Sequence, residues 1–146
     1  MDKKAIQIRL VHNESEQQAL YFQRWLVLRS PLGLPQGSEQ DKYEHQSVHL
    51  IAILDNQVVG SVRLRILASQ IGSLAYLAVL PQFQRQGIGS QLVKHLIQVA
   101  QNRGLPTVRA MARKEMLGFY QKLGFEPKGD EVEFLGKPHQ FVYLQL

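Results

Sequence analysis

The stretch LPQFQRQGIGSQLVKHLIQVAQNRG, residues 80–104, combines a turn rich in glutamine and glycine with a strongly amphipathic helix. In the helical part, polar residues separate apolar residues that recur every three or four positions, which predicts one buried face. Gly104 and Pro106 are expected to end the helix. The buried stripe consists of Ile88, Leu92, Leu96 and Ala100, with Val93 and Ile97 beside it.

The turn before this helix has the composition of an anion-binding site. Gly87 and Gly89 lack a Cβ atom, so the backbone N–H groups of the first helical turn can approach a ligand closely, where the helix dipole is positive. Arg85 adds a full positive charge. The turn therefore predicts a phosphate site, although glycines that only shape a helix start would give the same pattern.

Alternating apolar and polar residues predict strands on both sides of this segment, and helical spacing predicts two further helices. The expected strands cover residues 6–11, 48–54, 58–67, 71–79, 107–112, 131–135 and 140–146, and the further helices cover residues 13–30 and 114–123. A polar turn at residues 55–57 should make an antiparallel hairpin of the second and third strands. Residues 30–46 are rich in proline and glycine and are expected to form a long loop.

The first helix has a clear start signal. Asn13 can cap it, with Glu16 three positions later in a variant of the capping box, and Pro31 limits its extension. The expected buried face consists of Ala19, Phe22, Trp25 and Leu26.

Composition limits the class of protein. A chain of 146 residues with 45% hydrophobic content predicts one folded domain over residues 1–146. No apolar run is long enough for a membrane span, and the first residues do not resemble a secretory signal, so a cytoplasmic protein without a membrane partner is expected. Zero cysteines exclude disulfides, a cysteine nucleophile and thiolate metal sites.

The formal net charge of +5 favours polyanionic partners without choosing among them. The basic residues are spread along the chain, with no run of five or six and no nucleic-acid-binding signature. We therefore expect no nucleic-acid partner, and some of this charge would suit a phosphorylated cofactor.

Two ordered motifs resemble those of the GCN5-related N-acetyltransferases (GNAT). Gln84, Gly87 and Gly89 occupy the patterned positions of the family's motif A, and GFYQKLGF at residues 118–125 matches its motif B. This resemblance implies a single mixed, mostly antiparallel α/β (α+β) sheet of about seven strands flanked by helices. A dinucleotide-binding fold is disfavoured, because Leu92 stands where that fingerprint has its third glycine.

The resemblance also implies a cofactor, acetyl-CoA, held where the strand at residues 71–79 parts from the strand at residues 107–112. Backbone groups of the first strand would pair with the pantetheine amides, and the turn would hold the pyrophosphate. The implied cofactor-binding residues are Leu77, Ala78, Val79, Gln84, Arg85, Gln86, Gly87, Ile88 and Gly89. The alternative is that residues 77–79 are ordinary strand core.

The implied reaction moves an acetyl group to a primary amine of a small molecule or peptide by direct attack in a ternary complex. An N–H near Val79 could stabilise the oxyanion, and Tyr120, the tyrosine of motif B, is the implied donor of a proton to the coenzyme A thiolate. Alternatively, Tyr120 is only a core tyrosine that packs beside Phe119. Relatives often have asparagine where this chain has Met111, so one polar contact is expected to be missing.

The acceptor side is less determined. Its candidate residues are Arg29, Asp41, His49, Arg113 and His139. Arg113 could orient an anionic group, the acidic residues could bind a cationic acceptor, and the histidines could move protons. The segments at residues 31–33 and 136–139 resemble the ElaA-type branch of the superfamily. His45 and His49 have the spacing of a helical metal pair, but their neighbours favour a strand, so no metal site is predicted.

Two other functions remain open. A non-catalytic acyl-CoA sensor would keep the turn at residues 84–89 without turnover, and a nucleic-acid-binding module would show steeply salt-dependent binding. The final strands, with Phe134, Phe141, Val142 and Tyr143, could also belong to a homodimer surface.

Overall fold

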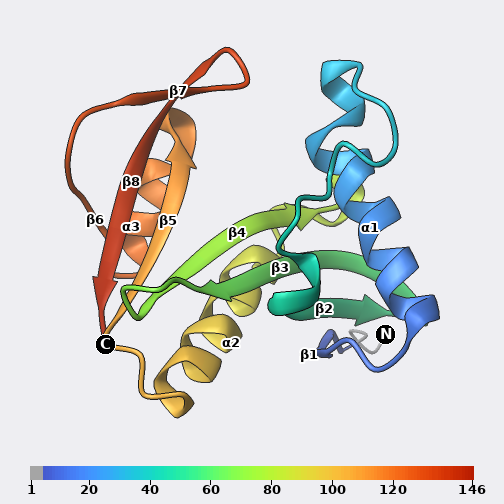
Figure 1. Cartoon of the computed structure of the whole chain (residues 1–146). Helices are drawn as coiled ribbons and strands as arrows, with labels where there is room; N and C mark the ends of the chain where they lie inside the picture. Colours follow the sequence, from blue (N-terminus) through green and yellow to red (C-terminus); the bar gives the residue numbers. More distant parts are fainter. Residues whose placement is uncertain (1–4) are drawn as a thin grey trace.

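The computed structural model describes residues 5–146, whose strands all belong to one mixed sheet (Figure 1). Its strand order is β1-β2-β3-β4-β5-β8-β6, and the short β7 pairs with β8. Every pairing is antiparallel except that of β4 with β5. The strands are β1 Gln7–Leu10, β2 Val48–Leu54, β3 Gln57–Ile66, β4 Ile71–Val79, β5 Thr107–Arg113, β6 Glu126–Pro127, β7 Val132–Phe134 and β8 Lys137–Gln145.

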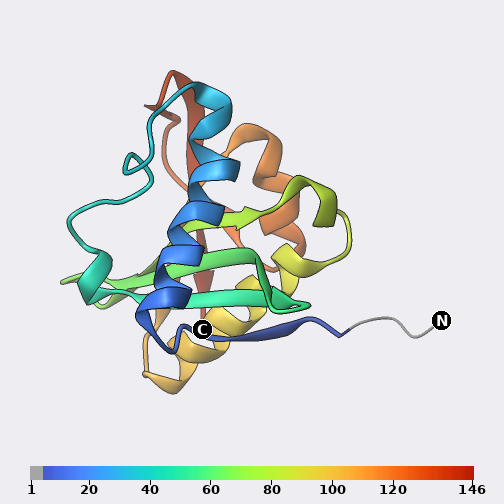
Figure 2. The ribbon, with the colours of Figure 1, turned by 90° about the vertical axis from the view of Figure 1, so that its right-hand side faces the viewer.

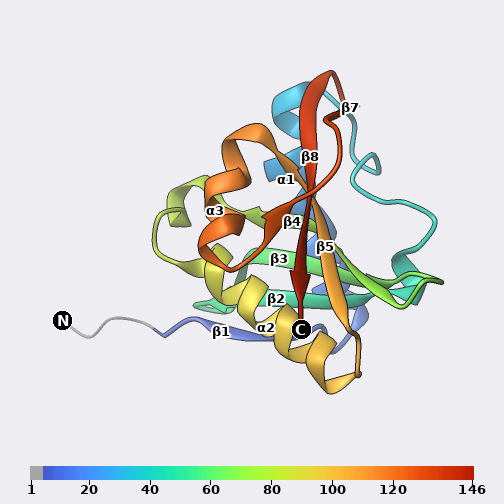
Figure 3. The ribbon, with the colours of Figure 1, turned by 90° about the vertical axis from the view of Figure 1, so that its left-hand side faces the viewer.

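Helices cover both faces of this sheet. Helix α1 (Glu14–Leu28) lies on one face, and α2 (Ile88–Asn102) and α3 (Leu117–Lys122) lie on the other (Figures 2 and 3). The predicted stripe of α2 is confirmed, since Ile88, Leu92, Leu96 and Ala100 are at most 1% exposed. The mixed, mostly antiparallel sheet flanked by helices is therefore confirmed. Within residues 5–146, no helix is both long and apolar enough to cross a bilayer.

Several boundaries differ from the sequence prediction. Residues 114–116 form a separate 3-10 turn, so α3 begins only at Leu117. The last strand begins three residues earlier than expected, because Lys137 and Pro138 pair with β7. The two-residue strand β6 was not predicted, since a pair of residues carries no periodic signal. The long loop is confirmed, with short 3-10 turns at Ser30–Leu32 and Glu44–Gln46.

The prediction for the buried face of α1 was wrong. Phe22 is 50% exposed and Leu26 is 38% exposed, while Gln23 and Arg24 are almost completely buried. Gln23 is buried because its amide donates to the carbonyl of Ala78 (3.0 Å) and accepts from the Ser61 hydroxyl (2.6 Å). Polar residues can occupy a core face when such partners satisfy them, and apolar spacing alone does not report this.

The start of α1 is confirmed as a capped terminus. The side chain of Asn13 accepts a hydrogen bond from the N–H of Glu16 at 2.9 Å. The Glu16 carboxylate accepts from the N–H of His12 (2.7 Å) and from Arg9, which lowers its pKa to about 2. The Arg9 bond is the largest cause.

Replacing Asn13 with alanine is expected to lower the free energy of unfolding by about 1 kcal/mol, because the cap bond to the first helical turn is lost. Urea denaturation followed by circular dichroism measures the change. Asn102→Ala, at the exposed last position of α2, is the control and should leave the midpoint nearly unchanged. Equal effects of the two substitutions would contradict the capping role.

The feature that positions the site is a fork between β4 and β5. The two strands pair in parallel only from Ile71–Leu74 against residues 107–110, although β4 continues to Val79 and β5 to Arg113. The pairing of β3 with β4 also shifts by one residue near Tyr76, whose φ of 56° marks a bulge. Figure 1 shows β5 and β8 turning away from β2–β4 beyond this point.

Candidate functional site

The predicted phosphate turn lies at one end of the fork, directly after β4. Pro81–Phe83 form a 3-10 turn, and Arg85 (φ 64°) and Gly87 (φ 81°) both adopt the left-handed conformation before α2 begins. The Gln84 side chain donates to the carbonyl of Val79 at 2.9 Å and so ties the turn to the end of β4. The first N–H groups of α2 have no intrahelical partners and present the positive end of the helix dipole at this corner.

The backbone conformation explains why glycine stands at one position of the turn, but not at the other. Gly87 has a positive φ that side chains rarely adopt. A Cβ on Gly89 would lie 3.6 Å from Phe119, an ordinary contact distance, so packing alone does not require glycine there. This closeness also brings the two sequence motifs together. A glycine that the chain does not need for its own packing fits a site where a ligand approaches the backbone.

The three strand residues predicted to pair with pantetheine lie beyond the parallel pairing, at the open part of β4. Leu77 and Val79 are half-buried, whereas Ala78 is 2% exposed. The carbonyl of Ala78 accepts from Gln23, and that of Val79 accepts from Gln84. A carbonyl oxygen has two lone pairs, so that of Val79 can accept one further bond, whereas that of Ala78 lies on the side of β3, where Ala78 pairs with Ser61.

A cavity of about 560 Å³ occupies the fork. Leu77 lines it from β4 and Met111 from β5. Met116 and Tyr120 contribute from the side of the sheet that carries α3, while Arg29 at the end of α1 contributes from the opposite side. The cavity therefore passes through the sheet, so two molecules that enter from opposite faces can meet inside it.

Tyr120 lines this cavity and is largely buried, with 5% of its surface exposed. Its ring packs edge-on against Phe119 and Phe125, with centroids 5.1 and 5.4 Å away. Burial raises the pKa of Tyr120 well above its ordinary value, and the Arg113 charge opposes this only weakly. The phenol is therefore neutral at working pH and keeps a proton to donate.

Four of the five predicted acceptor-side residues line the cavity: Arg29, Asp41, Arg113 and His139. The fifth, His49, does not, because its ring nitrogen contacts the backbone carbonyl of Glu44 at 2.8 Å, away from the fork. Burial is the largest cause that lowers the pKa of His49. His49 therefore helps to hold the long loop and is poorly placed to contact an acceptor.

His139 lines the cavity with 7% of its surface exposed. Its Nδ1 lies 2.9 Å from the carbonyl of Lys137. Because a carbonyl can only accept a hydrogen bond, this contact favours the tautomer with the proton on Nδ1. Nε2 is then the nitrogen that can accept a proton.

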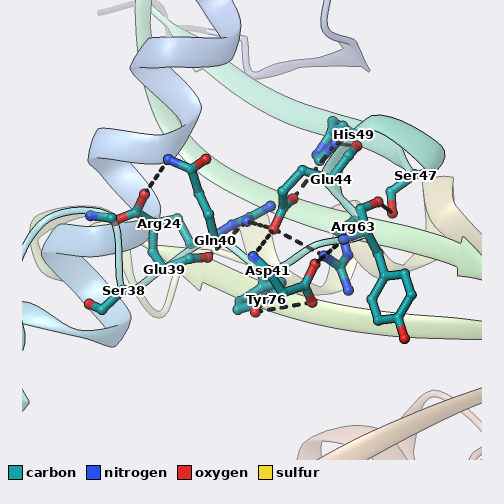
Figure 4. Close-up of polar contacts among 12 residues, drawn as sticks. Arg24, Ser38, Glu39, Gln40, Asp41, Glu44, Ser47, His49, Arg63 and Tyr76 are labelled. Atoms are coloured by element: carbon teal, nitrogen blue, oxygen red, sulfur yellow. Dashed lines mark hydrogen bonds and ion pairs between the residues drawn. The ribbon is translucent and has the colours of Figure 1, made fainter.

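Sequence reasoning missed a buried ionic cluster that fastens the long loop over the sheet (Figure 4). One oxygen of Glu44, Oε2, accepts from Arg24 on α1 and from Arg63 on β3, both at 3.0 Å. It also accepts from the N–H of Asp41 at 3.0 Å. Arg24, Glu44 and Arg63 are at most 5% exposed. Their charges look like surface residues in the sequence, and only the tertiary contacts reveal their role.

Asp41 and Tyr76 extend this cluster to the cavity wall. Arg63 donates to Asp41 at 2.7 Å, and the guanidinium carbons of Arg24 and Arg63 lie 4.2 and 4.8 Å from the Tyr76 ring centroid. Partial burial opposes ionisation of Asp41, but the hydrogen bonds from Arg63 and from the N–H of Tyr43 outweigh it and lower the pKa of the carboxyl. Asp41 is thus an ionised partner of Arg63 and a weak base. Among residues 5–146, no group of three or more histidine and acidic side chains is placed to hold a metal ion.

Comparisons with known proteins agree with this geometry. A family model described as acetyltransferase (GNAT) family matches residues 13–125. The protein YyaT of Bacillus subtilis, named as uncharacterized, is 30% identical over 108 residues, which cover 74% of this chain and 72% of YyaT.

Two solved structures show the same fold. Escherichia coli ElaA superposes with a TM-score of 0.83 at 18% identity, over 97% of this chain and 100% of ElaA. A Bacillus subtilis acetyltransferase in complex with CoA superposes with a TM-score of 0.74 at 20% identity, over 97% and 99% of the two chains. At this identity, ElaA shows the same fold.

Proposed function

Since this chain belongs to the GNAT acetyltransferase family, we propose that it transfers the acetyl group of acetyl-CoA directly to a primary amine while both are bound. The observation that carries this proposal is the cavity that crosses the sheet at the β4–β5 fork. Acetyl-CoA enters from the side of α2 and α3, and the acceptor enters from the side of α1. The Bacillus subtilis acetyltransferase that was solved in complex with CoA superposes on nearly the whole chain, which supports the choice of cofactor.

The cofactor is held at two places. The N–H groups at the start of α2, with Arg85 beside them, bind the pyrophosphate. Backbone groups of Leu77 and Val79 at the open edge of β4 pair with pantetheine, because beyond Leu74 no β5 residue pairs with β4. The thioester then lies in the cavity near Met111 and Tyr120, which both line it.

The transfer forms one C–N bond and breaks one C–S bond. A protonated amine has no lone pair for attack, so the ammonium first loses a proton, either to water or to Nε2 of His139. The neutral amine attacks the thioester carbonyl and forms an oxyanion, which a strand N–H near Val79 stabilises. Collapse of this intermediate expels the thiolate, and Tyr120 donates its phenolic proton to the sulfur. The nitrogen of the new amide loses its second proton to water, and Tyr120 regains a proton from water before the next turnover.

Initial-velocity kinetics test the proposal. Release of free thiol is measured while acetyl-CoA and a primary amine are varied, and mass spectrometry identifies the acetylated amine. Direct attack predicts intersecting double-reciprocal lines, because both substrates must be bound before thiol leaves. Parallel lines would contradict direct attack. Tight binding of acetyl-CoA without turnover of any amine would favour the alternative, a non-catalytic acyl-CoA sensor.

A further inference from the structure

Two arginines on the acceptor side of the cavity lie in one row across the sheet. Arg65 on β3 pairs with Ser73 on β4, and Ser73 pairs in turn with Arg109 on β5. Residues in direct register project from the same face, and all three line the cavity. Two strand spacings put the Cα atoms of Arg65 and Arg109 about 10 Å apart, so both guanidiniums can reach one small molecule.

Neither guanidinium has an acidic partner. Within residues 5–146, Arg65 and Arg109 donate no hydrogen bond to another side chain or carbonyl and form no ion pair. Nε of Arg65 is buried and lacks a hydrogen-bond partner. The terminal nitrogens of Arg65 also have no partner within residues 5–146 but are not fully buried, so they are the donors that a bound acceptor group can reach.

Aromatic rings hold both guanidiniums in place. The guanidinium carbon of Arg65 lies 3.8 Å from the ring centroid of Tyr43, and that of Arg109 lies 4.6 Å from the centroid of Phe141. A planar guanidinium that stacks on a ring keeps its N–H edge free, which suits bidentate recognition of a carboxylate or phosphate. Stacking also reduces the side-chain freedom lost on binding.

The rest of the cavity does not neutralise these charges. Asp41 is the one acidic residue among those that line it, and its carboxylate is engaged by Arg63. Lys137 adds a further cation to the lining. The acceptor compartment is therefore positive, which favours an anionic ligand group.

This row is too far from the phosphate turn to serve the cofactor's pyrophosphate. Ser73 precedes Val79, at the turn, by six residues along β4, which corresponds to about 20 Å. The row also lies within the paired part of β4 and β5, whereas the opening for pantetheine begins after Leu74.

We propose that the acceptor amine carries an oxyanion group, a carboxylate or a phosphate, and that Arg65 and Arg109 bind this group. The inference rests on the proposed transferase function and specifies its substrate class. The same positive charge lowers the pKa of a bound ammonium, because like charges disfavour its protonated form. The two arginines therefore select the acceptor and also favour its reactive neutral amine.

Matched acceptors test the inference. Acetylation rates are compared for each of the common amino acids and its carboxamide, and for phosphoethanolamine and ethanolamine. Wild type is expected to prefer the charged member of at least one pair by about tenfold or more in kcat/KM. A preference for amino acids identifies a carboxylate, and a preference for phosphoethanolamine identifies a phosphate.

Arg65→Gln and Arg109→Gln should each raise KM for the charged acceptor about tenfold and leave KM for acetyl-CoA unchanged. Arg103→Gln, at the exposed end of α2, is the matched control and should behave as wild type. The inference is overturned if wild type prefers the uncharged members, if it acetylates other amines but no member of these pairs, or if both variants keep the wild-type preference. Calorimetric binding of acetyl-CoA is measured on every variant, so loss of the cofactor site is recognised separately.

Discussion

Tyr120→Phe is expected to lower kcat by about 10²-fold or more, because the substitution removes the proposed proton donor to the departing thiolate. The ring and its packing against Phe119 and Phe125 remain, so the protein should stay folded and bind acetyl-CoA with nearly unchanged affinity. Stopped assays of acetylated product, together with calorimetry, separate the two effects. A rate within threefold of wild type would remove Tyr120 from the mechanism.

The raised pKa of Tyr120 fixes the sign of its pH effect. A proton donor acts only while protonated, and burial keeps the phenol protonated beyond the pH at which an ordinary tyrosine ionises. Loss of rate from ionisation of this group is therefore not expected below about pH 10. Below this pH, a rate that increases as the pH rises would report deprotonation of the amine or of a base. Tyr120→Phe should leave the midpoint pH of that increase unchanged.

Glu44→Ala is expected to lower the free energy of unfolding by about 3–5 kcal/mol, since it leaves the buried cations Arg24 and Arg63 without their shared partner. Chemical denaturation measures this change. Glu131→Ala removes an ion pair with Lys114 at 2.8 Å, in which both side chains are more than half exposed, and should leave stability nearly unchanged. Similar losses for the two variants would contradict the importance of burial.

A triple variant tests whether the buried charges are needed for stability, or whether it is enough that none of them lacks a partner. Arg24→Met, Glu44→Leu and Arg63→Met together replace three buried charges with apolar groups of similar size. We expect this variant to be much more stable than Glu44→Ala, because no buried cation is left without its partner and Asp41, which loses Arg63, has 32% of its side chain exposed to water. A loss equal to or larger than that of Glu44→Ala would show that the charges themselves hold the loop in place.

The sequence predicted the part of the fold that depends on local pattern. Strand β4 has its expected ends, and the helix after the glycine turn has its expected buried stripe. Both follow from regular spacing of apolar residues, and Gly104, which has a positive φ, marks the helix end as a glycine should. The same rules failed at α1, because hydrogen bonds to other elements made Gln23 and Arg24 interior residues.

In the candidate site, too, the residues within local motifs could be predicted from the sequence, whereas those that only tertiary structure brings together could not. The predicted phosphate turn and Tyr120 could be proposed because they lie in two short motifs, and the structure then showed that these motifs lie close together at Gly89 and Phe119. Arg65 and Arg109 were not proposed, since they are far apart in sequence and meet only through strand register. The bulge at Tyr76 was also missed, because its left-handed φ belongs to a bulky residue that carries no glycine signal.

Most of the residues predicted to form a homodimer surface on the last strands are not exposed in the structure. Val142 is fully buried, Phe141 and Tyr143 are half-buried, and Phe134, at 41%, is the one exposed residue of the four proposed. It lies at the tip of the β7–β8 hairpin and also lines the cavity. The dimer stays a prediction, and sedimentation of the free protein would test it.

Calorimetric titration with acetyl-CoA tests the central claim most directly. Wild type should bind with micromolar affinity. Gly87→Glu combined with Gly89→Glu should abolish binding, because it adds bulk and two negative charges at the proposed pyrophosphate site. Gly104→Glu is the matched control, since Gly104 has a similar positive φ of 75° at the opposite end of α2. The account predicts loss of binding only at the turn; no binding by wild type, or unchanged binding by the folded double variant, would contradict it.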